Sequence, residues 1–207
     1  MDLMNWFSFL IAAMLLTFAP GPDVMYLLAK SLSSGARHGV TLALGLACGC
    51  IFHTTLVAIG VAAFIQSSPM ALHILMYLGS AYLLYLSFGA FRAKPAPVAI
   101  PGVTDSYDKW GLYRRGVLMN ALNPKVLLFF LAFFPKFIDP SASLSPSLQI
   151  FLLGITFAVQ AFCCFSFVAV CAGKIRDRIL GYQNFSLIMN RVEGSILLLI
   201  AVGLLFL

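Results

Sequence analysis

Residues 39–65 read GVTLALGLACGCIFHTTLVAIGVAAFI and contain one ionisable side chain, His53. A helix needs about 20 mostly apolar residues to cross a bilayer, so this run is long enough to span a membrane. In lipid only helices and closed barrels satisfy every backbone polar group, and runs this long and continuous exclude barrel strands. The sequence therefore predicts an all-α integral membrane protein with six transmembrane helices. The other five apolar runs are residues 3–29, 69–91, 116–137, 148–172 and 192–207.

The composition argues against a soluble protein. Of the 207 residues, 61% are hydrophobic and 10% are charged, whereas soluble domains average roughly 45–50% apolar and about 25% charged residues. A single domain of this length cannot bury so much apolar surface away from water. The net charge of +6 comes from basic residues scattered between the apolar runs, so we expect no nucleic-acid partner. A lipid bilayer is the expected surrounding medium, and a soluble enzyme and a disordered chain are excluded.

The basic residues predict the orientation in the membrane. Eleven of the 13 lysines and arginines lie in the connections after the first, third and fifth runs; of the other two, Lys125 lies within the fourth run and Lys136 is the only one on the other side. Because cytoplasmic connections are rich in Lys and Arg, we expect both termini outside. The eleven residues are Lys30, Arg37, Arg92, Lys94, Lys109, Arg114, Arg115, Lys174, Arg176, Arg178 and Arg191.

The single transmembrane domain, residues 1–207, divides into two similar halves. Residues 92–115 contain three prolines and are expected to form a cytoplasmic linker between the first repeat, residues 3–91, and the second, residues 116–207. Each repeat has three predicted helices and begins with a helix broken at a proline motif. Because three is odd, the halves cross the membrane in opposite directions, which is the inverted-repeat plan of many secondary transporters. Broken helices in matching positions indicate a binding site near the midplane.

Two opposite charges, Asp23 and Lys125, occupy equivalent positions in the first helices of the two halves. A charge at the centre of a membrane helix costs about 2.5–3.5 kcal/mol on insertion scales, so each needs a partner or water. One interpretation is a permanent Asp23–Lys125 ion pair. The other is a shared aqueous cavity in which Asp23 attracts an ammonium group and Lys125 attracts a carboxylate. Because an amino acid carries both groups, this second arrangement suits a zwitterion.

The prolines of the two motifs create free backbone groups. Each of Pro20, Pro22 and Pro124 lacks an N–H donor and disrupts the helix around it, and Gly21 allows a turn and the close approach of a ligand. Asn123 is placed to cap a new helix that has Pro124 at its first position. We expect the free N–H groups to bind a carboxylate and the free C=O groups to bind an ammonium.

Two polar residues lie in the middle of other predicted helices. His53 shares a helix face with Gly45 and Gly49, and this G-x-x-x-G spacing allows close packing of a second helix. His53 therefore points into the bundle, where it either carries a proton or forms a structural hydrogen bond. Gln160 is predicted either to bind substrate or to join two helices. Glycine motifs of this kind also permit a homodimer.

No motif indicates a cofactor, a metal or an enzymatic reaction. A Walker A motif and an H-E-x-x-H motif are absent, and the apolar runs suggest no pair of like charges for a divalent cation. We therefore expect no cofactor and no enzyme activity. The alternatives considered are a cation or metal efflux transporter, which Lys125 disfavours, and a membrane enzyme that uses His53 or the cysteines. All five cysteines lie in apolar runs and are expected to remain free: Cys48, Cys50, Cys163, Cys164 and Cys171.

The two proline motifs resemble the signatures of the LysE/RhtB family of amino-acid exporters. The resemblance is carried by the stretches 19–23 (APGPD), 78–83 (LGSAYL) and 123–125 (NPK), with 128–130 (LFF) after it. It implies export of amino acids or related metabolites across the bacterial cytoplasmic membrane, in exchange for protons, through six helices built as inverted repeats.

These inferences combine into one hypothesis, a secondary transporter that works by alternating access. Asp23 and the break around Pro20, Gly21 and Pro22 are expected to contact the amino group of the substrate. Lys125, Asn123 and the break at Pro124 are expected to contact its carboxylate, with Gln160 as a further binding candidate. Asp23 or His53 is expected to carry the coupled proton.

Overall fold

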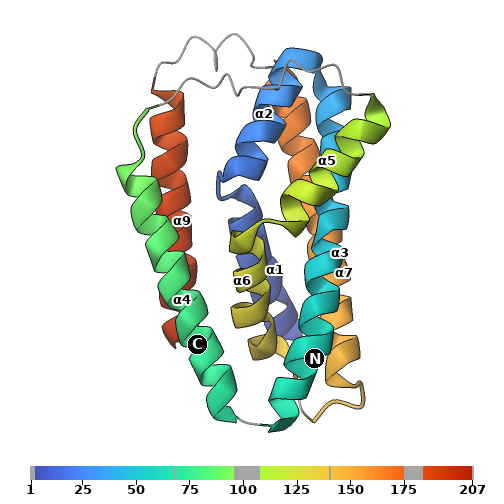
Figure 1. Cartoon of the computed structure of the whole chain (residues 1–207), viewed down its shortest axis with the longest axis vertical. Coiled ribbons are helices and arrows are strands. Elements are labelled where there is room, and N and C mark those ends of the chain that lie inside the picture. Colours follow the sequence, from blue (N-terminus) through green and yellow to red (C-terminus); the bar gives the residue numbers. More distant parts are fainter. Residues whose placement is uncertain (1–2, 68, 96–107, 140, 175–183, 207) are drawn as a thin grey trace.

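The computed structural model describes residues 3–67, 69–95, 108–139, 141–174 and 184–206. Every regular element in these ranges is a helix (Figure 1). Four helices are single spans: α3 (Ala36–Ser67), α4 (Pro69–Arg92), α7 (Pro146–Lys174) and α9 (Phe185–Phe206). The others form bent pairs: α1 (Leu3–Phe18) with α2 (Pro22–Ser34), and α5 (Lys109–Ala121) with α6 (Pro124–Phe133) and the 3-10 turn η1 (Phe134–Phe137).

Each bent pair counts as one broken span, which confirms the predicted six-span architecture. The chain turns by 61° between α1 and α2, and by 52° between α5 and α6. Both breaks fall at the proline motifs, because a proline at the first position of α2 and of α6 lacks the N–H needed to continue the preceding helix.

Two helices begin earlier than the hydropathy of the sequence predicts. The last span starts at Phe185 instead of residue 192, which makes it long enough to cross a bilayer. The second half starts at Lys109 instead of residue 116, because the Asp108 carboxylate caps α5 by accepting a hydrogen bond of 2.8 Å from the Gly111 N–H. Residues 96–107 of the expected linker lie outside the described part of the chain.

The helices pack as two groups, α4 with α9 and the remaining helices. The α4 and α9 helices lie side by side at one edge of the molecule (Figure 1). In the second group, α3, α5 and α7 lie at the other edge, and α1, α2 and α6 lie between the edges. The Ser80 hydroxyl donates to the Ala201 carbonyl at 2.8 Å, and the Ser87 hydroxyl donates to the Gly194 carbonyl at 2.7 Å. These two bonds join α4 and α9 into one unit.

Small residues bring α3 and α5 into close contact, as the G-x-x-x-G spacing predicted. A Cβ atom on Gly45 would collide with the Tyr113 carbonyl, and one on Gly49 would lie 2.7 Å from the Asn120 Cβ. The facing Gly116 is equally restricted, since its Cβ would lie 2.6 Å from the Leu42 carbonyl oxygen. The end of α5, and with it the second break, is thereby held firmly against α3.

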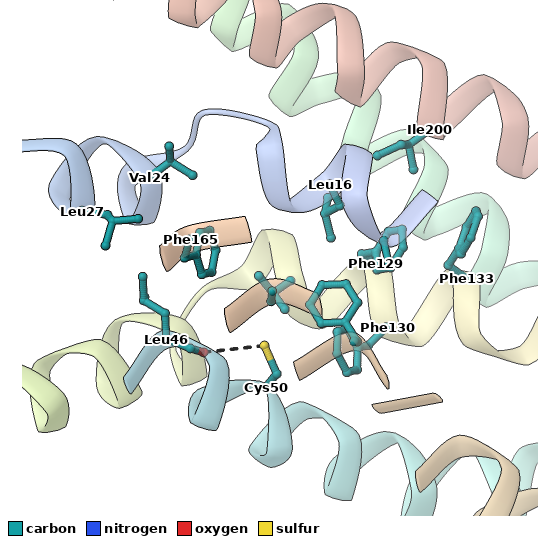
Figure 2. Packing of buried hydrophobic residues seen from close by; sticks show 14 of the residues in the cluster. Leu16, Val24, Leu27, Leu46, Cys50, Phe129, Phe130, Phe133, Phe165 and Ile200 are labelled. Carbon is teal, nitrogen blue, oxygen red and sulfur yellow. Dashed lines mark hydrogen bonds between the residues drawn. The ribbon is translucent and has the colours of Figure 1, made fainter. Parts of the chain in front are cut away.

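The apolar core surrounds both breaks. Leu16 and Val24 from the first broken pair belong to one cluster with Phe129 and Phe130 from the second, and Leu16 lies near Phe129 (Figure 2). The Phe130 and Phe134 rings stack with their centroids 4.1 Å apart. The Cys50 thiol donates to the Leu46 carbonyl at 3.6 Å (Figure 2), and all five cysteines are free.

Candidate functional site

The two helix breaks meet inside the bundle. The Asn123 side-chain amide donates a hydrogen bond of 2.7 Å to the Asp23 carboxylate, which joins residues 100 positions apart in the sequence. Asp23, Asn123 and Lys125 are 6%, 7% and 7% exposed. The two broken helices thus bring the polar residues of both motifs into one buried cluster.

The second helix of each pair starts with proline, but the two starts are capped differently. In α6 the Asn123 Oδ1 accepts a hydrogen bond of 3.0 Å from the Lys125 N–H, and Pro124 occupies the first position, as predicted. In α2 the cap residue is Gly21, which has no side chain to bond the first-turn N–H groups, and Pro22 follows it. Asp23 lies in that first turn, where a negative charge is favourable.

Lys125 pairs with a carboxylate other than Asp23. Its ammonium Nζ donates to the Ala19 carbonyl at 3.0 Å and to the Glu193 Oε1 at 3.3 Å. The direct Asp23–Lys125 ion pair weighed in the sequence analysis is therefore not formed. Lys125 instead caps the free carbonyl at the end of α1 and is neutralised by a residue of α9.

Glu193 is the site residue that the sequence analysis missed. The signal for it was available, because an acidic residue inside a predicted span is by default a functional candidate. It also corrects the expectation that the spans contain no pair of like charges, since Asp23 and Glu193 both lie near Lys125. The described residues nevertheless contain no group of three or more His, Cys, Asp or Glu side chains arranged to hold a metal.

Gly21 makes the approach of Lys125 to the first break possible. A Cβ atom at this position would lie 2.7 Å from the Lys125 Nζ and 3.3 Å from the Glu193 Oε1. The space that a side chain would fill is taken by the ion pair itself. The close approach expected at Gly21 is therefore made by a charged group of the same chain.

His53 caps the second break in the way that Lys125 caps the first. Its ring Nε2 lies 2.8 Å from the Asn120 carbonyl oxygen, and since a carbonyl only accepts, Nε2 carries the proton. His53 is fully buried, and its Nδ1 has no hydrogen-bond partner. Of the two interpretations left open for His53, this geometry fits the structural hydrogen bond.

Gln160 joins two helices. Its amide nitrogen donates to the Thr17 hydroxyl at 2.9 Å, and it also lies 3.4 Å from the Ala13 carbonyl. Both partners belong to the last two turns of α1 before the break. Gln160 therefore ties α7 to the first broken helix, which is the second of its two predicted roles.

A small cavity lies between the breaks. Its volume is about 20 Å³, which is enough for about one water molecule and too little for an amino acid. Four of the predicted site residues line it, and Pro20, Pro22, Pro124 and Gln160 do not. The polar lining residues are Thr17, Asp23, Asn120, Asn123 and Lys125, and the remaining lining residues are Leu16, Ala19, Gly21, Val24, Val126, Phe157 and Phe165.

Comparison with known families identifies the kind of protein to which this site belongs. The family model described as LysE type translocator matches residues 14–207, which include both broken helices. The chain belongs to the LysE type translocator family. The translocator is accordingly a multi-pass protein of the bacterial cytoplasmic membrane, as its apolar helices require.

Several curated proteins resemble this translocator over nearly their full length. An uncharacterized membrane protein of Vibrio cholerae is 33% identical over 196 residues, covering 94% of this chain and 93% of the relative. Leucine efflux proteins of Salmonella choleraesuis and Salmonella paratyphi A are each 28% identical over 200 residues, covering 97% of this chain and 92% of the relative. No solved structure matches the chain.

Proposed function

We propose that this LysE type translocator is a secondary active exporter of amino acids, coupled to protons and working by alternating access. The observation that carries the proposal is the meeting of the two broken helices at a cavity lined by both Asp23 and Lys125. The family and the relatives named leucine efflux proteins support the same substrate class. A cation exporter is disfavoured because Lys125 would repel its substrate.

The site suits the two charged ends of an amino acid. Asp23 is the acceptor for the substrate ammonium, since the Ala19 carbonyl is already bonded to Lys125 and the Asn120 carbonyl to His53 and to the Asn123 N–H. Lys125, Asn123 and the uncapped N–H groups at the start of α2 are the donors for the carboxylate. The apolar lining, which includes Val24 and Phe157, suits an aliphatic side chain.

Export by this route requires the site to open to each side of the membrane in turn. The cavity of about 20 Å³ has to enlarge before an amino acid enters, so the helices around it must separate. The α4–α9 unit, joined by its two serine hydrogen bonds, is the body that we propose to move against the rest.

Asp23 is our preferred carrier for the coupled proton. It lines the cavity, so it can exchange its proton for a substrate ammonium, whereas His53 is bonded to the Asn120 carbonyl and does not line the cavity. Asp23 cannot hold a proton and a substrate ammonium at the same time. This mutual exclusion couples the movement of substrate to the movement of a proton.

The proposal is tested by profiling the growth medium of expressing cells by mass spectrometry. One or a few amino acids should accumulate outside cells that express the native chain. Cells expressing Asp23→Asn at an equal membrane level should match cells without the protein, because the amide neither attracts an ammonium nor carries a proton. If Asp23→Asn exports as well as the native chain, the assignment of Asp23 is wrong.

Asp139→Asn is the matched control for this experiment. Asp139 lies in the connection between η1 and α7, where hydrogen bonds from the Ser141 hydroxyl and N–H hold the pKa of its carboxyl below the usual value. An asparagine oxygen accepts the same bonds, so export should be unchanged. Absence of any difference in extracellular amino acids between native and empty cells would count against amino-acid export itself.

A further inference from the structure

The partner of Lys125 is itself a carboxylate. The Glu193 Oε1 lies 3.3 Å from the Lys125 Nζ, and the Glu193 side chain is 17% exposed. A substrate amino acid presents the same chemical group to the same lysine. The contact between Glu193 and Lys125 therefore has the form of the contact that we propose for the substrate.

The two carboxylates approach Lys125 from different directions. Lys125 lines the cavity between the breaks, whereas Glu193 is not among the lining residues. Glu193 belongs to α9, on the α4–α9 unit, and it reaches the lysine beside Gly21. A substrate in the cavity would thus meet one side of the ammonium while Glu193 holds the other.

Electrostatics allows only one of the two carboxylates to be well compensated. The Lys125 ammonium already donates to the Ala19 carbonyl, and in the proposed function the substrate ammonium compensates Asp23 and is not available to a second carboxylate. A second carboxylate on the same ammonium would leave an uncompensated charge in a buried site, which is strongly unfavourable. The incoming carboxylate therefore displaces Glu193, which then becomes hydrated or takes up a proton.

We infer that Glu193 is an internal stand-in for the substrate carboxylate, and that substrate releases α9 from Lys125 by taking its place. The inference rests on the proposed function and extends it by a residue that controls affinity and conformation together. In the empty protein the Glu193–Lys125 pair holds the α4–α9 unit against the broken helices at the level of the site. Loading the site removes that restraint.

A second lysine, Lys136, joins α9 to the other helices at a second point, near the end of α9. The Lys136 Nζ donates to the Leu204 carbonyl at 2.6 Å, and a Cβ atom on Gly79 of α4 would collide with the Ala132 Cβ of α6. These contacts do not compete with a substrate carboxylate at the cavity. We therefore expect release of Glu193 to loosen α9 near the site while this end stays in place.

The test is equilibrium binding of radiolabelled L-leucine to the purified full chain in lipid nanodiscs. Glu193→Gln removes the competing charge and keeps the size of the side chain, so it should bind leucine more tightly, by roughly 5-fold or more. Arg191→Gln, an exposed charge on the same helix, is the matched control and should behave as the native chain.

A leucine analogue without a carboxylate separates competition from a general change in the site. The amine 3-methylbutylamine keeps the ammonium and the side chain, so its ability to displace labelled leucine should give equal affinities in the native chain and in Glu193→Gln. An equal gain for the amine, or weaker or unchanged leucine binding by Glu193→Gln, overturns the inference.

A second variant, Glu193→Asp, guards against the case in which Glu193→Gln fails to fold. Glu193→Asp keeps the charge and moves the carboxylate away from Lys125 by one methylene group, so it should give an intermediate gain in leucine affinity. If both variants fail to fold, Glu193 is a fixed structural partner of Lys125 and the inference is overturned. If the native chain neither binds nor exports any amino acid, the proposed function fails, which is a distinct result.

Discussion

At the scale of single residues, a basic side chain from another helix bonds one carbonyl at each break. Lys125 bonds the Ala19 carbonyl, and His53 bonds the Asn120 carbonyl, which also accepts from the Asn123 N–H at 2.9 Å. A buried carbonyl without a partner costs about 1–3 kcal/mol, so these bonds help to stabilise breaks that would otherwise be unfavourable in lipid. Both breaks therefore exist without relying on a bound ligand.

Gly21→Ala should impair transport and destabilise the protein by about 1–3 kcal/mol. The new Cβ would lie 2.7 Å from the Lys125 Nζ, so the lysine has to move away from the buried Ala19 carbonyl that it bonds. A displaced ammonium is misplaced for the substrate carboxylate, and we expect export to fall by about tenfold or more. Export assays and thermal unfolding of the purified variant measure the two effects.

Gly89→Ala is the comparison for this substitution. Gly89 lies in α4, and its Cβ would meet no heavy atom within 4 Å. Export by Gly89→Ala should equal that of the native chain. Normal export by Gly21→Ala would show that the position of Lys125 is not critical.

At the scale of elements, the bend of each pair is held from outside the pair. Gln160 of α7 bonds the Thr17 hydroxyl at the end of α1, and Gly45 and Gly49 of α3 seat the end of α5. The prolines explain why a helix stops, but these neighbours determine the direction in which the next one starts. The site is therefore positioned by α3 and α7 as much as by the motifs themselves.

Substitutions of His53 test whether this residue stabilises the second break by its hydrogen bond or carries the coupled proton. His53→Leu removes one of the hydrogen bonds that the Asn120 carbonyl accepts, while the bond of 2.9 Å from the Asn123 N–H remains, so it should destabilise the protein by about 0.5–1.5 kcal/mol. His53→Gln can restore the hydrogen bond to this carbonyl, so both the stability and the proton dependence of export should stay close to those of the native chain.

Thermal unfolding and export at several imposed proton gradients provide these measurements. His73→Gln, at an exposed position of α4, is the control for replacing a histidine. A stable His53→Gln protein whose export no longer responds to the gradient would instead identify His53 as the proton carrier.

At the scale of the whole molecule, the two chain ends lie on one side of the bundle, opposite the turn between α2 and α3 (Figure 1). The α4–α9 unit meets the other helices along α6 and α1 and at the Glu193–Lys125 pair. This division is what alternating access would use. A homodimer stays a prediction, for which Gly60, Gly89 and Gly203 offer helix surfaces where an added Cβ would meet no heavy atom of the chain within 4 Å.

The basic connections predict the topology, which alkaline phosphatase fusions can test because this enzyme is active only outside the cytoplasm. A fusion after Leu207 should be active, because the basic connections predict that both termini lie outside. A fusion after Lys94 should be inactive, because that connection is expected in the cytoplasm. The reverse pattern of activities would invert the proposed orientation and, with it, the direction of each half-helix.

The sequence by itself determined the medium, the six spans and the two breaks. These features are local, since apolar length requires a membrane helix and a proline without its N–H interrupts one. It also marked Asp23, Asn123 and Lys125 as residues that need partners, and Glu193 could have been found by the same rule. Helix starts at Lys109 and Phe185 were less predictable, because polar residues at the ends of spans obscure the hydropathy.

Only the tertiary structure decided which group each of these residues contacts. Asn123 bonds Asp23, Lys125 bonds Glu193, and His53 bonds the Asn120 carbonyl. These partners are separated by 67 to 100 positions in the sequence. Their pairing depends on how six spans pack and on the space left by residues such as Gly21. Local patterns show that a buried charge needs a partner, but the choice of partner is made by the packing of distant helices.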